Sequence, residues 1–519
     1  MNVIEKIKET PLYAKILFFL FILKLILFNY LTEVQDKSIL LICISFIYFI
    51  SLSLIIHELS RRKKFFFTIY WIVSAIMFYD CLYFQYFNQL PTFRVIKQVK
   101  QVGSILDSIR YLLKPVYFLF LIDLPLFRIY LKRAQKRLDT EDVPKKWNRR
   151  VLAISILLLF MPYTIAYSVN RDYVTKMSRE EIFTYHATDL VNNFLKKPGY
   201  RRYRIEELIE ANEKRKSQYS SERKHFGLAK DRNLIVIQVE SLQNFPINRL
   251  YEGQEITPNL NRLIQKDSIY FDNYYQQLGR GNTSDAEFVT NNSLYPAMDG
   301  ITYEMYADNT YYGLPWILKE REYQTIAFHG YKGSFWNREN AYPNQGFDRF
   351  ISEKDFTIHE PIGFGLNDKE FFEQSIPYLQ EIQKPFYAFM VTLTNHHPYQ
   401  LPEKHRHLKL RADHEGTIFG DYLQSVRYTD EAIGMFIEEL KRIGLYDNSL
   451  IAIYGDHHGI VLKDEVGNKC VSEFLGKKYD YDEMMKVPLI IHIPGSGVTE
   501  TNSILGGQID FLPTIMNLM

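Results

Sequence analysis

Five long apolar runs occupy the first 170 residues of this 519-residue chain. A helix that crosses a bilayer needs about 20 mostly apolar residues, and stretches such as SILLICISFIYFISLSLII meet that requirement. Buried helices of a soluble protein are the alternative, but five such runs in succession are rare in a soluble domain. We therefore predict a transmembrane domain over residues 1–170, with five helices at about 13–32, 38–58, 65–88, 111–131 and 151–169. The fourth run is the weakest, because it carries Asp123 and Arg128.

Basic residues between the runs predict the orientation of the chain. Cytoplasmic loops are enriched in lysine and arginine, and the segments 61–64 and 132–150 are strongly basic. We expect a multi-pass protein of the cell membrane, with its N-terminus inside and an extracellular part after residue 170. The loop 89–110 also holds basic residues, which argues against this orientation, but the segment 132–150 outweighs it. The first run is too long for a cleavable signal peptide, and other runs follow it.

Charge and cysteine content narrow the possible partners and bonds. The formal net charge is only +2, so no global basic field indicates a nucleic acid partner. Of the three cysteines, only Cys470 lies after residue 170, so no disulfide is expected within the outer part. An oxidising compartment permits disulfides without requiring them.

The pattern after residue 170 changes twice. Residues 171–230 are polar and charged, and we expect a helical linker there. From residue 231 to 519, short apolar runs such as NLIVIQVE and LIAIYGDHHG alternate with helical runs such as YTDEAIGMFIEELKRIG. Apolar strands that alternate with helices are typical of a largely parallel sheet with helices on both faces. The predicted architecture is therefore a five-helix transmembrane domain, a linker and an extracellular α/β domain.

Polar side chains follow four of the predicted strands. They are Glu240, His329, the triplet Asn395-His396-His397 and the triplet Asp456-His457-His458. Ligands of such sheets bind beyond the carboxyl ends of the strands. A single polar residue at a strand end is common and is often only a solvated turn. Four ends that all carry metal-binding or acid–base side chains favour a functional site.

The motifs VESLQNF, EITPNLNRL, GNTSDAEF, SFWNREN, TNHHPY and YGDHHG occur in the order found in lipoteichoic acid synthases. Over about residues 233–515 the chain resembles these membrane-anchored glycerophosphate transferases of the alkaline phosphatase and sulfatase superfamily. The chain ends at DFLPTIMNLM, where similar proteins continue, so we expect the sulfatase-like domain to be incomplete at its C-terminus.

The resemblance implies specific roles for eight residues. Glu240, Thr283, Asp456 and His457 would bind one divalent cation, and Thr283 would be the nucleophile. The glycerophosphate would contact His329, Trp336, Arg338 and His396. Two carboxylates, an imidazole and a threonine oxygen form a mostly hard ligand set, which suits Mn²⁺ or Mg²⁺, with Zn²⁺ possible because of the histidine. By resemblance we expect Mn²⁺.

The same residues suggest a reaction. Binding to a cation lowers the pKa of a hydroxyl and makes it a better nucleophile. Thr283 would attack the phosphorus of phosphatidylglycerol, release diacylglycerol and form a glycerophosphoryl-threonine intermediate. A growing lipoteichoic acid chain or its glycolipid anchor would then accept the group. Arg338 would form a forked pair with phosphate oxygens, and His396 would protonate the leaving oxygen.

Three other functions are weighed against this reading. A phosphoethanolamine transferase would resemble this chain, but those enzymes carry several disulfides in the outer domain. A sulfatase needs a cysteine or serine followed by proline and arginine at fixed spacing, whereas Ser284 is followed by Asp285, Ala286 and Glu287. A catalytically silent envelope-binding membrane protein would be favoured if a metal ligand were missing, and none is.

Two adjacent hydroxyls, Thr283 and Ser284, raise the question of which one reacts. Ser284 and Glu287 have the spacing of a capping box, in which the serine is the N-cap of a helix. That pattern predicts a structural hydroxyl at Ser284 and leaves Thr283, outside the helix, free to reach the metal.

Overall fold

A computed structural model of the chain describes residues 12–32, 39–60, 63–93, 103, 106–125, 128–129, 149–169, 179–194, 223–298, 300–383 and 385–519. It divides into two compact units. We call residues 1–97 and 109–201 the N-terminal unit, and residues 98–108 and 202–519 the C-terminal unit. Most of the basic segment 132–150 and most of the predicted linker lie outside the described residues.

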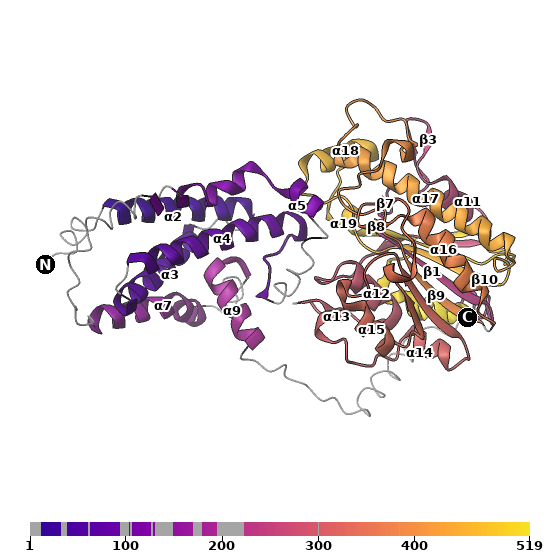
Figure 1. The fold of residues 1–519 in the computed structure, drawn as a ribbon, viewed down its shortest axis with the longest axis horizontal. Coiled ribbons are helices and arrows are strands. Elements are labelled where there is room, and N and C mark those ends of the chain that lie inside the picture. The colour runs from indigo at the N-terminus through magenta and orange to yellow at the C-terminus, as the bar shows by residue number, and fades with distance from the viewer. Residues whose placement is uncertain are drawn as a thin grey trace. The chain divides into compact units, whose positions relative to one another are not determined.

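Four of the five apolar runs form helices in the N-terminal unit (Figure 1). They are α2 (Leu12–Leu31), α3 (Ile39–Ser60), α4 (Lys63–Phe87) and α7 (Arg149–Val169), and α9 (Ile182–Phe194) follows them. The helices enclose a core that includes Phe21, Phe49, Tyr70 and Met77. Within the described residues, no helix combines the length and the apolar character that crossing a membrane requires.

The prediction of one continuous helix over residues 111–131 was wrong. The described part of this run contains the end of α5 (Leu106–Leu112) and the 3₁₀ helix η2 (Pro115–Phe120). Proline lacks an amide hydrogen and its ring displaces the preceding turn, so Pro115 begins a new element instead of continuing α5. After η2, Asp123 forms an ion pair with the buried Lys24 of α2, with Nζ 2.7 Å from Oδ1.

A nine-stranded sheet forms the centre of the C-terminal unit in the described residues. Its strand order is β12 (Glu500–Asn502), β4 (Ser268–Tyr275), β11 (Lys486–His492), β10 (Ser449–Gly455), β1 (Asn233–Val239), β9 (Phe386–Val391), β5 (Gln324–His329) and β6 (Arg349–Ile351), and β13 (Gly506–Gly507) also pairs with β4. The strands from β10 to β6 are all parallel, whereas β11 is antiparallel to both of its neighbours. The predicted α/β sheet is thus confirmed as a mixed, mostly parallel one.

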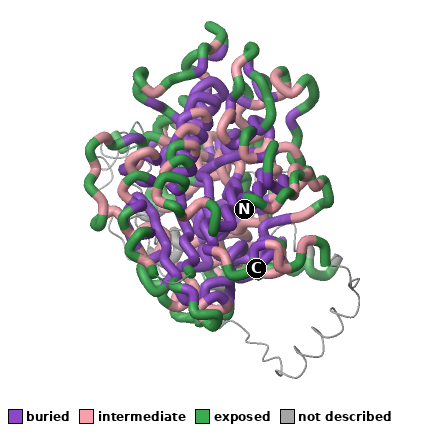
Figure 2. Tube along the Cα trace, turned by 90° about the vertical axis from the view of Figure 1, so that its right-hand side faces the viewer, coloured by how far each residue is buried: buried purple, intermediate pink, exposed green. Residues whose placement is uncertain are grey.

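Helices cover both faces of this sheet (Figure 1). The side chains of Ile235 and Ile237 of β1 join one apolar core, and those of Leu234 and Val236 join the other. The first core includes residues of α11 (Pro258–Ile264), α16 (Asp368–Gln380), α17 (Ile418–Arg442), α18 (Glu465–Leu475) and α19 (Tyr481–Met485). The second includes residues of α12 (Thr283–Asn292), α13 (Thr302–Met305), α14 (Leu314–Lys319), α15 (Arg338–Gln345) and α20 (Phe511–Leu518). Because every residue of β1 is buried, the strand reads as a continuous apolar run. In Figure 2 the buried residues lie in the interior and the exposed ones on the outer loops.

Candidate active site

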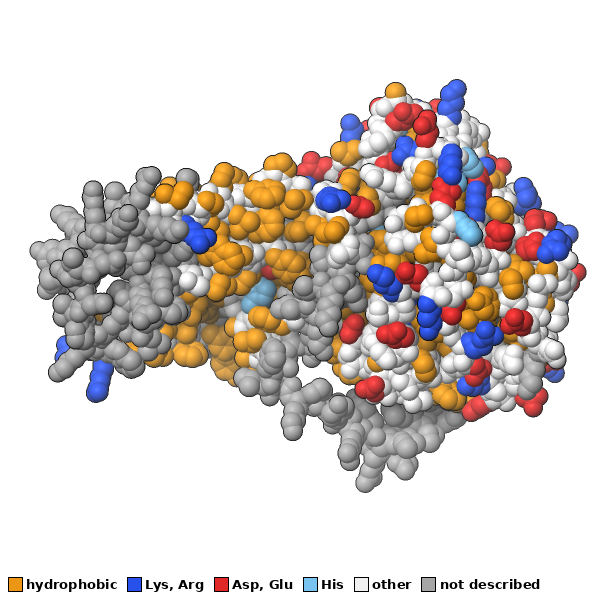
Figure 3. Space-filling model, in the orientation of Figure 1, with side chains coloured by type: hydrophobic (Ala, Val, Ile, Leu, Met, Phe, Trp, Pro, Cys, Tyr) orange, Lys and Arg blue, Asp and Glu red, His pale blue; other side chains and the backbone are white. Residues whose placement is uncertain are grey.

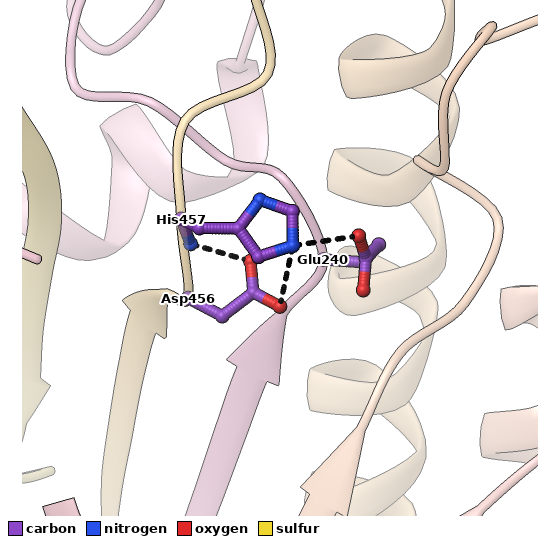
Figure 4. Close-up of side chains that lie close together, drawn as sticks. All are labelled: Glu240, Asp456 and His457. Carbon is purple, nitrogen blue, oxygen red and sulfur yellow. Dashed lines mark hydrogen bonds and ion pairs between the residues drawn. The ribbon is translucent and has the colours of Figure 1, made fainter. Parts of the chain in front are cut away.

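The carboxyl ends of two neighbouring strands bring three predicted metal ligands together. β1 and β10 run parallel, with Val239 opposite Gly455. Glu240 directly follows β1, and Asp456 and His457 directly follow β10, so the three side chains meet at one edge of the sheet (Figure 4). His457 Nε2 lies 3.2 Å from Glu240 Oε1 and 3.6 Å from Asp456 Oδ2. All three residues are almost completely buried.

This group has the composition of a divalent metal site. One ligand atom from each of the three residues lies within 4.8 Å of the others. Asp456 Oδ1 accepts hydrogen bonds from the backbone amides of Ser241, at 2.7 Å, and His457, at 2.6 Å. The buried Oδ2 of Asp456 has no hydrogen-bond partner among the described residues. Since a buried carboxylate oxygen without a partner is costly, these residues fit a cation that Oδ2 would bind.

The charges of Glu240, Asp456 and His457 also favour a bound cation. Burial by itself lowers the pKa of an imidazole, but Asp456 and Glu240 raise the pKa of His457 to about 10. Burial raises the pKa of Asp456 well above its usual value, and the neighbouring Glu240 carboxylate raises it further. Two carboxylates buried side by side are poorly stabilised as anions without a positive partner, and a divalent cation bound between them would neutralise their charge.

Two glutamines orient the turn that carries the histidine. His457 Nδ1 lies 2.9 Å from the carbonyl oxygen of His458, so Nδ1 carries a hydrogen and Nε2 faces the carboxylates. Gln276 Nε2 lies 2.8 Å from His458 Nδ1, and Gln276 Oε1 accepts from the His458 amide. Gln508 donates to the carbonyl of Asp456 at 2.7 Å. Outer partners of this kind fix the orientation of metal ligands, and no pattern in the sequence points to either glutamine.

Thr283 reaches the same group from the first position of α12. Its Oγ1 donates to Glu240 Oε2 at 3.2 Å and lies 3.4 Å from His457 Nε2. All four residues that the resemblance implies as metal ligands thus lie together. The N-terminus of a helix carries about half a positive charge, so this position favours phosphate and a threonine alkoxide.

The predicted capping box at Ser284 was wrong. Asn282 is the N-cap of α12, and its side chain makes no capping hydrogen bond. Ser284 lies inside the helix, and its hydroxyl donates to the carbonyl of Gly281 at 2.9 Å. The carboxylate of Glu287 binds Arg338 instead of reaching back to the helix start. Ser284 is still held in a structural contact. Thr283, predicted to lie outside the helix, is its first residue, and its hydroxyl faces the candidate metal ligands.

Asp285 holds the glycine-rich turn in front of Thr283. Its Oδ2 accepts from the amides of Gly279, at 3.0 Å, and Gly281, at 2.7 Å, and its Oδ1 accepts from the Thr302 hydroxyl at 3.0 Å. A Cβ atom at Gly281 would lie 2.6 Å from Asp285 Oδ1, so only glycine fits there. No linear pattern predicts this role for Asp285, because its hydrogen bonds depend on how the turn folds back on the helix.

Two predicted substrate-binding histidines end or follow neighbouring strands. His396 follows β9, and its Nδ1 lies 2.8 Å from the carbonyl oxygen of His397, so Nε2 is the ring nitrogen without a hydrogen-bond partner among the described residues. The ring of His396 lies against Phe364, with 3.9 Å between ring centroids. His329 ends β5, with Nδ1 3.2 Å from the carbonyl oxygen of Val391. Burial lowers the pKa of both imidazoles, so both are neutral near pH 7.

Arg338 and Trp336 lie in the segment that follows β5. Arg338 is buried, and its Nη2 lies 2.6 Å from Glu287 Oε1. Trp336 is half-buried, in a left-handed conformation with φ of 56°, and its ring lies 5.4 Å from that of Phe335. The contacts of His329, Trp336, Arg338 and His396 with a substrate stay predictions.

Two family models match the chain. The model described as "Sulfatase" matches residues 232–519, and the model of the "Lipoteichoic acid synthase N-terminal domain" matches residues 1–197. Together the two models match all of the chain except residues 198–231.

Individual relatives agree with these models. Lipoteichoic acid synthase 1 of Bacillus subtilis (strain 168) is 34% identical over 467 residues, which cover 86% of this chain and 72% of the relative. Lipoteichoic acid synthase of Staphylococcus aureus (strain USA300) is 33% identical over 465 residues, which cover 86% of this chain and 71% of the relative. The crystal structure of the lipoteichoic acid synthase LtaP from Listeria monocytogenes is 32% identical with a TM-score of 0.53, covering 57% of this chain and 73% of that one. The chain therefore belongs to the lipoteichoic acid synthase family.

Proposed function

We propose that this protein is a metal-dependent phosphoglycerol transferase that moves glycerol phosphate from phosphatidylglycerol to a lipoteichoic acid chain or its glycolipid anchor. The observation that carries the proposal is the position of Thr283 Oγ1 beside Glu240 and His457 in a family of lipoteichoic acid synthases. A hydroxyl held against a buried carboxylate and a buried imidazole has the surroundings of an activated nucleophile.

Glu240, Thr283, Asp456 and His457 would hold the cation. The mostly hard ligand set suits Mn²⁺ or Mg²⁺, and we propose Mn²⁺ because of the resemblance to lipoteichoic acid synthases. When bound, the cation would stabilise the threonine alkoxide and the charge on the phosphoryl oxygens. Glu240 Oε2 accepts the hydrogen of Thr283 and so aims the attacking oxygen.

The reaction then proceeds in two steps, the formation and the breakdown of the glycerophosphoryl-threonine intermediate. In the first, Thr283 Oγ1 loses its proton and bonds to phosphorus, the bond from phosphorus to the diacylglycerol oxygen breaks, and that oxygen gains a proton. In the second, a hydroxyl of the acceptor attacks phosphorus, the bond to Thr283 breaks, and the threonine regains its proton. His396 Nε2 would first take up a proton, because the neutral ring keeps its single hydrogen on Nδ1, held by the His397 carbonyl. It would then give that proton to the leaving oxygen in the first step and take one from the acceptor hydroxyl in the second.

We also propose that the N-terminal unit anchors the enzyme in the cell membrane, with the C-terminal unit outside the cell. Large apolar side chains face outward on α2 and α7, including Phe19 (61% exposed), Leu157 (68%) and Phe160 (60%). Hydrophobic side chains cover much of the visible surface of these helices, whereas acidic and basic groups are mixed over the C-terminal unit (Figure 3). Anchoring in the bilayer keeps the enzyme at a high effective concentration of its lipid donor.

The proposal is tested by incubating the purified full chain with fluorescent phosphatidylglycerol, with and without a glycolipid acceptor. We expect diacylglycerol to form only in the presence of a divalent cation and mass spectrometry to find glycerophosphate on Thr283. Full turnover by Thr283→Ala, or by chelated protein, would refute the assigned mechanism.

A further inference from the structure

The acid that holds Arg338 belongs to the same helix as the nucleophile. Glu287 lies four residues after Thr283, which is about one turn of α12. Its Oε1 accepts from Arg338 Nε at 3.0 Å and from Nη2 at 2.6 Å, and its Oε2 accepts from the Tyr342 hydroxyl at 2.7 Å. One helical turn thus carries both the attacking oxygen and the partner of the arginine.

Stability alone does not account for this pair. Arg338 is 1% exposed and Glu287 is fully buried, and a buried ion pair is on average no more stabilising than apolar side chains of the same volume. The backbone that leads into Arg338 also contains two consecutive left-handed residues, Trp336 (φ 56°) and Asn337 (φ 59°). Such conformations cost about 1–3 kcal/mol each and cluster at functional sites. The backbone directly before the buried arginine is therefore strained.

The contacts of the guanidinium leave one edge available. A guanidinium has five N–H donors. Glu287 takes the Nε donor and one Nη2 donor, and the carbonyl of Phe335 takes one Nη1 donor at 3.3 Å. Within the described residues, one donor on Nη1 and one on Nη2 have no partner. Two such donors match two oxygens of one phosphate group.

We propose that Glu287 is a positioning residue for Arg338. It holds the Nε and Nη2 edge of the guanidinium, so that the remaining Nη1 and Nη2 donors face a phosphate group beside Thr283. This inference rests on the proposed function, because it assigns the phosphate to the glycerophosphate donor. Since Glu287 and Thr283 share α12, the separation between the nucleophile and the phosphate-binding edge is fixed by a rigid element.

The test compares Glu287→Gln with the wild-type full chain in Mn²⁺. Glutamine keeps the shape of the side chain but loses the charge that binds two guanidinium donors. We expect kcat/KM for fluorescent phosphatidylglycerol to fall about 100-fold, since a misplacement of about 1 Å has effects of that size. Calorimetric binding of glycerol phosphate should weaken at least tenfold, while the bound Mn²⁺ per chain stays unchanged.

A double variant separates positioning from a purely structural role. If Glu287 acts through Arg338, adding Glu287→Gln to Arg338→Lys should cost little beyond Arg338→Lys alone. Glu439→Gln is the matched control, because Glu439 forms a similar fork with Arg442 on the exposed side of α17. That variant should keep the wild-type kcat/KM and the wild-type affinity for glycerol phosphate.

Wild-type kinetics and binding in Glu287→Gln, or additive losses in the double variant, would overturn the inference. If Glu287→Gln does not fold, Tyr342→Phe replaces it, since this change removes one hydrogen bond from Glu287 Oε2. It should lower kcat/KM about three- to tenfold, and an unchanged value would overturn the inference. If the wild type releases no diacylglycerol but binds glycerol phosphate in a Glu287-dependent way, the proposed function fails and the positioning role stands.

Discussion

Replacing Asp430 with alanine should destabilise the C-terminal unit by removing a cap that comes from a distant helix. α11 begins with Pro258, and its N-cap Thr257 makes no side-chain capping bond. Asp430 of α17 fills that role, because it accepts from the amides of Asn259, at 3.0 Å, and Leu260, at 2.8 Å. It also accepts from the Asn259 side chain at 2.8 Å.

The magnitude follows from what Asp430→Ala leaves behind. Two helix amides lose their acceptor, and each unsatisfied buried donor costs about 1–3 kcal/mol. The Asn259 side chain is only partly buried and finds water after a small rotation, so it adds little. We therefore expect the free energy of unfolding to fall by about 3 kcal/mol at pH 7.

Urea unfolding followed by the fluorescence of Trp316 and Trp336 measures this loss in the C-terminal unit. Trp71 and Trp147 are replaced by phenylalanine in every variant, so that the N-terminal unit contributes no tryptophan signal. Glu438→Ala is the control, because Glu438 is exposed on α17 and, in the described part of the chain, its ion-pair partner is the exposed Lys441. That control should change stability by less than about 0.5 kcal/mol. A loss below about 1 kcal/mol in Asp430→Ala would show that the two amides do not depend on this carboxylate.

Four further predictions concern pH, the two hydroxyls, the metal and the topology. Burial raises the pKa of Asp430 to about 6, above its unfolded value near 3.8, so its contribution to stability should decline as pH rises from about 4 through 6. The difference in the free energy of unfolding between wild type and Asp430→Ala should therefore be larger at pH 5 than at pH 7.5, and a difference that grows with pH would contradict this. Ser284→Ala should cost at most about 1 kcal/mol and keep turnover, because Gly281 still accepts from the Ser284 amide at 2.9 Å, whereas a covalent adduct found on Ser284 would reverse the assignment. Asp456→Ala should lose both turnover and bound Mn²⁺ by elemental analysis, and a full equivalent of metal in that variant would refute its role as a ligand. Protease added to intact cells should cut within 170–230, and cutting only after permeabilisation would indicate the opposite orientation.

The linear pattern of residues was enough to predict which segments form the sheet and which polar side chains follow its strands. The run NLIVIQVE became β1 because a strand buried on both faces is mostly apolar, and its buried Gln238 is paired with Thr283 and Tyr454. Glu240, Asp456 and His457 then had to meet, since parallel neighbouring strands end at the same edge of a sheet. These outcomes depend on local composition and strand pairing, which a linear pattern records.

Tertiary structure alone decided the partners of individual side chains. Glu287 has the spacing of a capping box, yet its carboxylate binds Arg338, which lies 51 residues away in the chain. Residues 111–131 are apolar enough to suggest one helix, but the described part breaks at Pro115, and Asp123 pairs with Lys24 of another helix. In each case a buried charged or hydrogen-bonding group pairs with a group that is distant in sequence but close in the packed structure. An unpaired buried group costs more free energy than a local motif such as a capping box contributes.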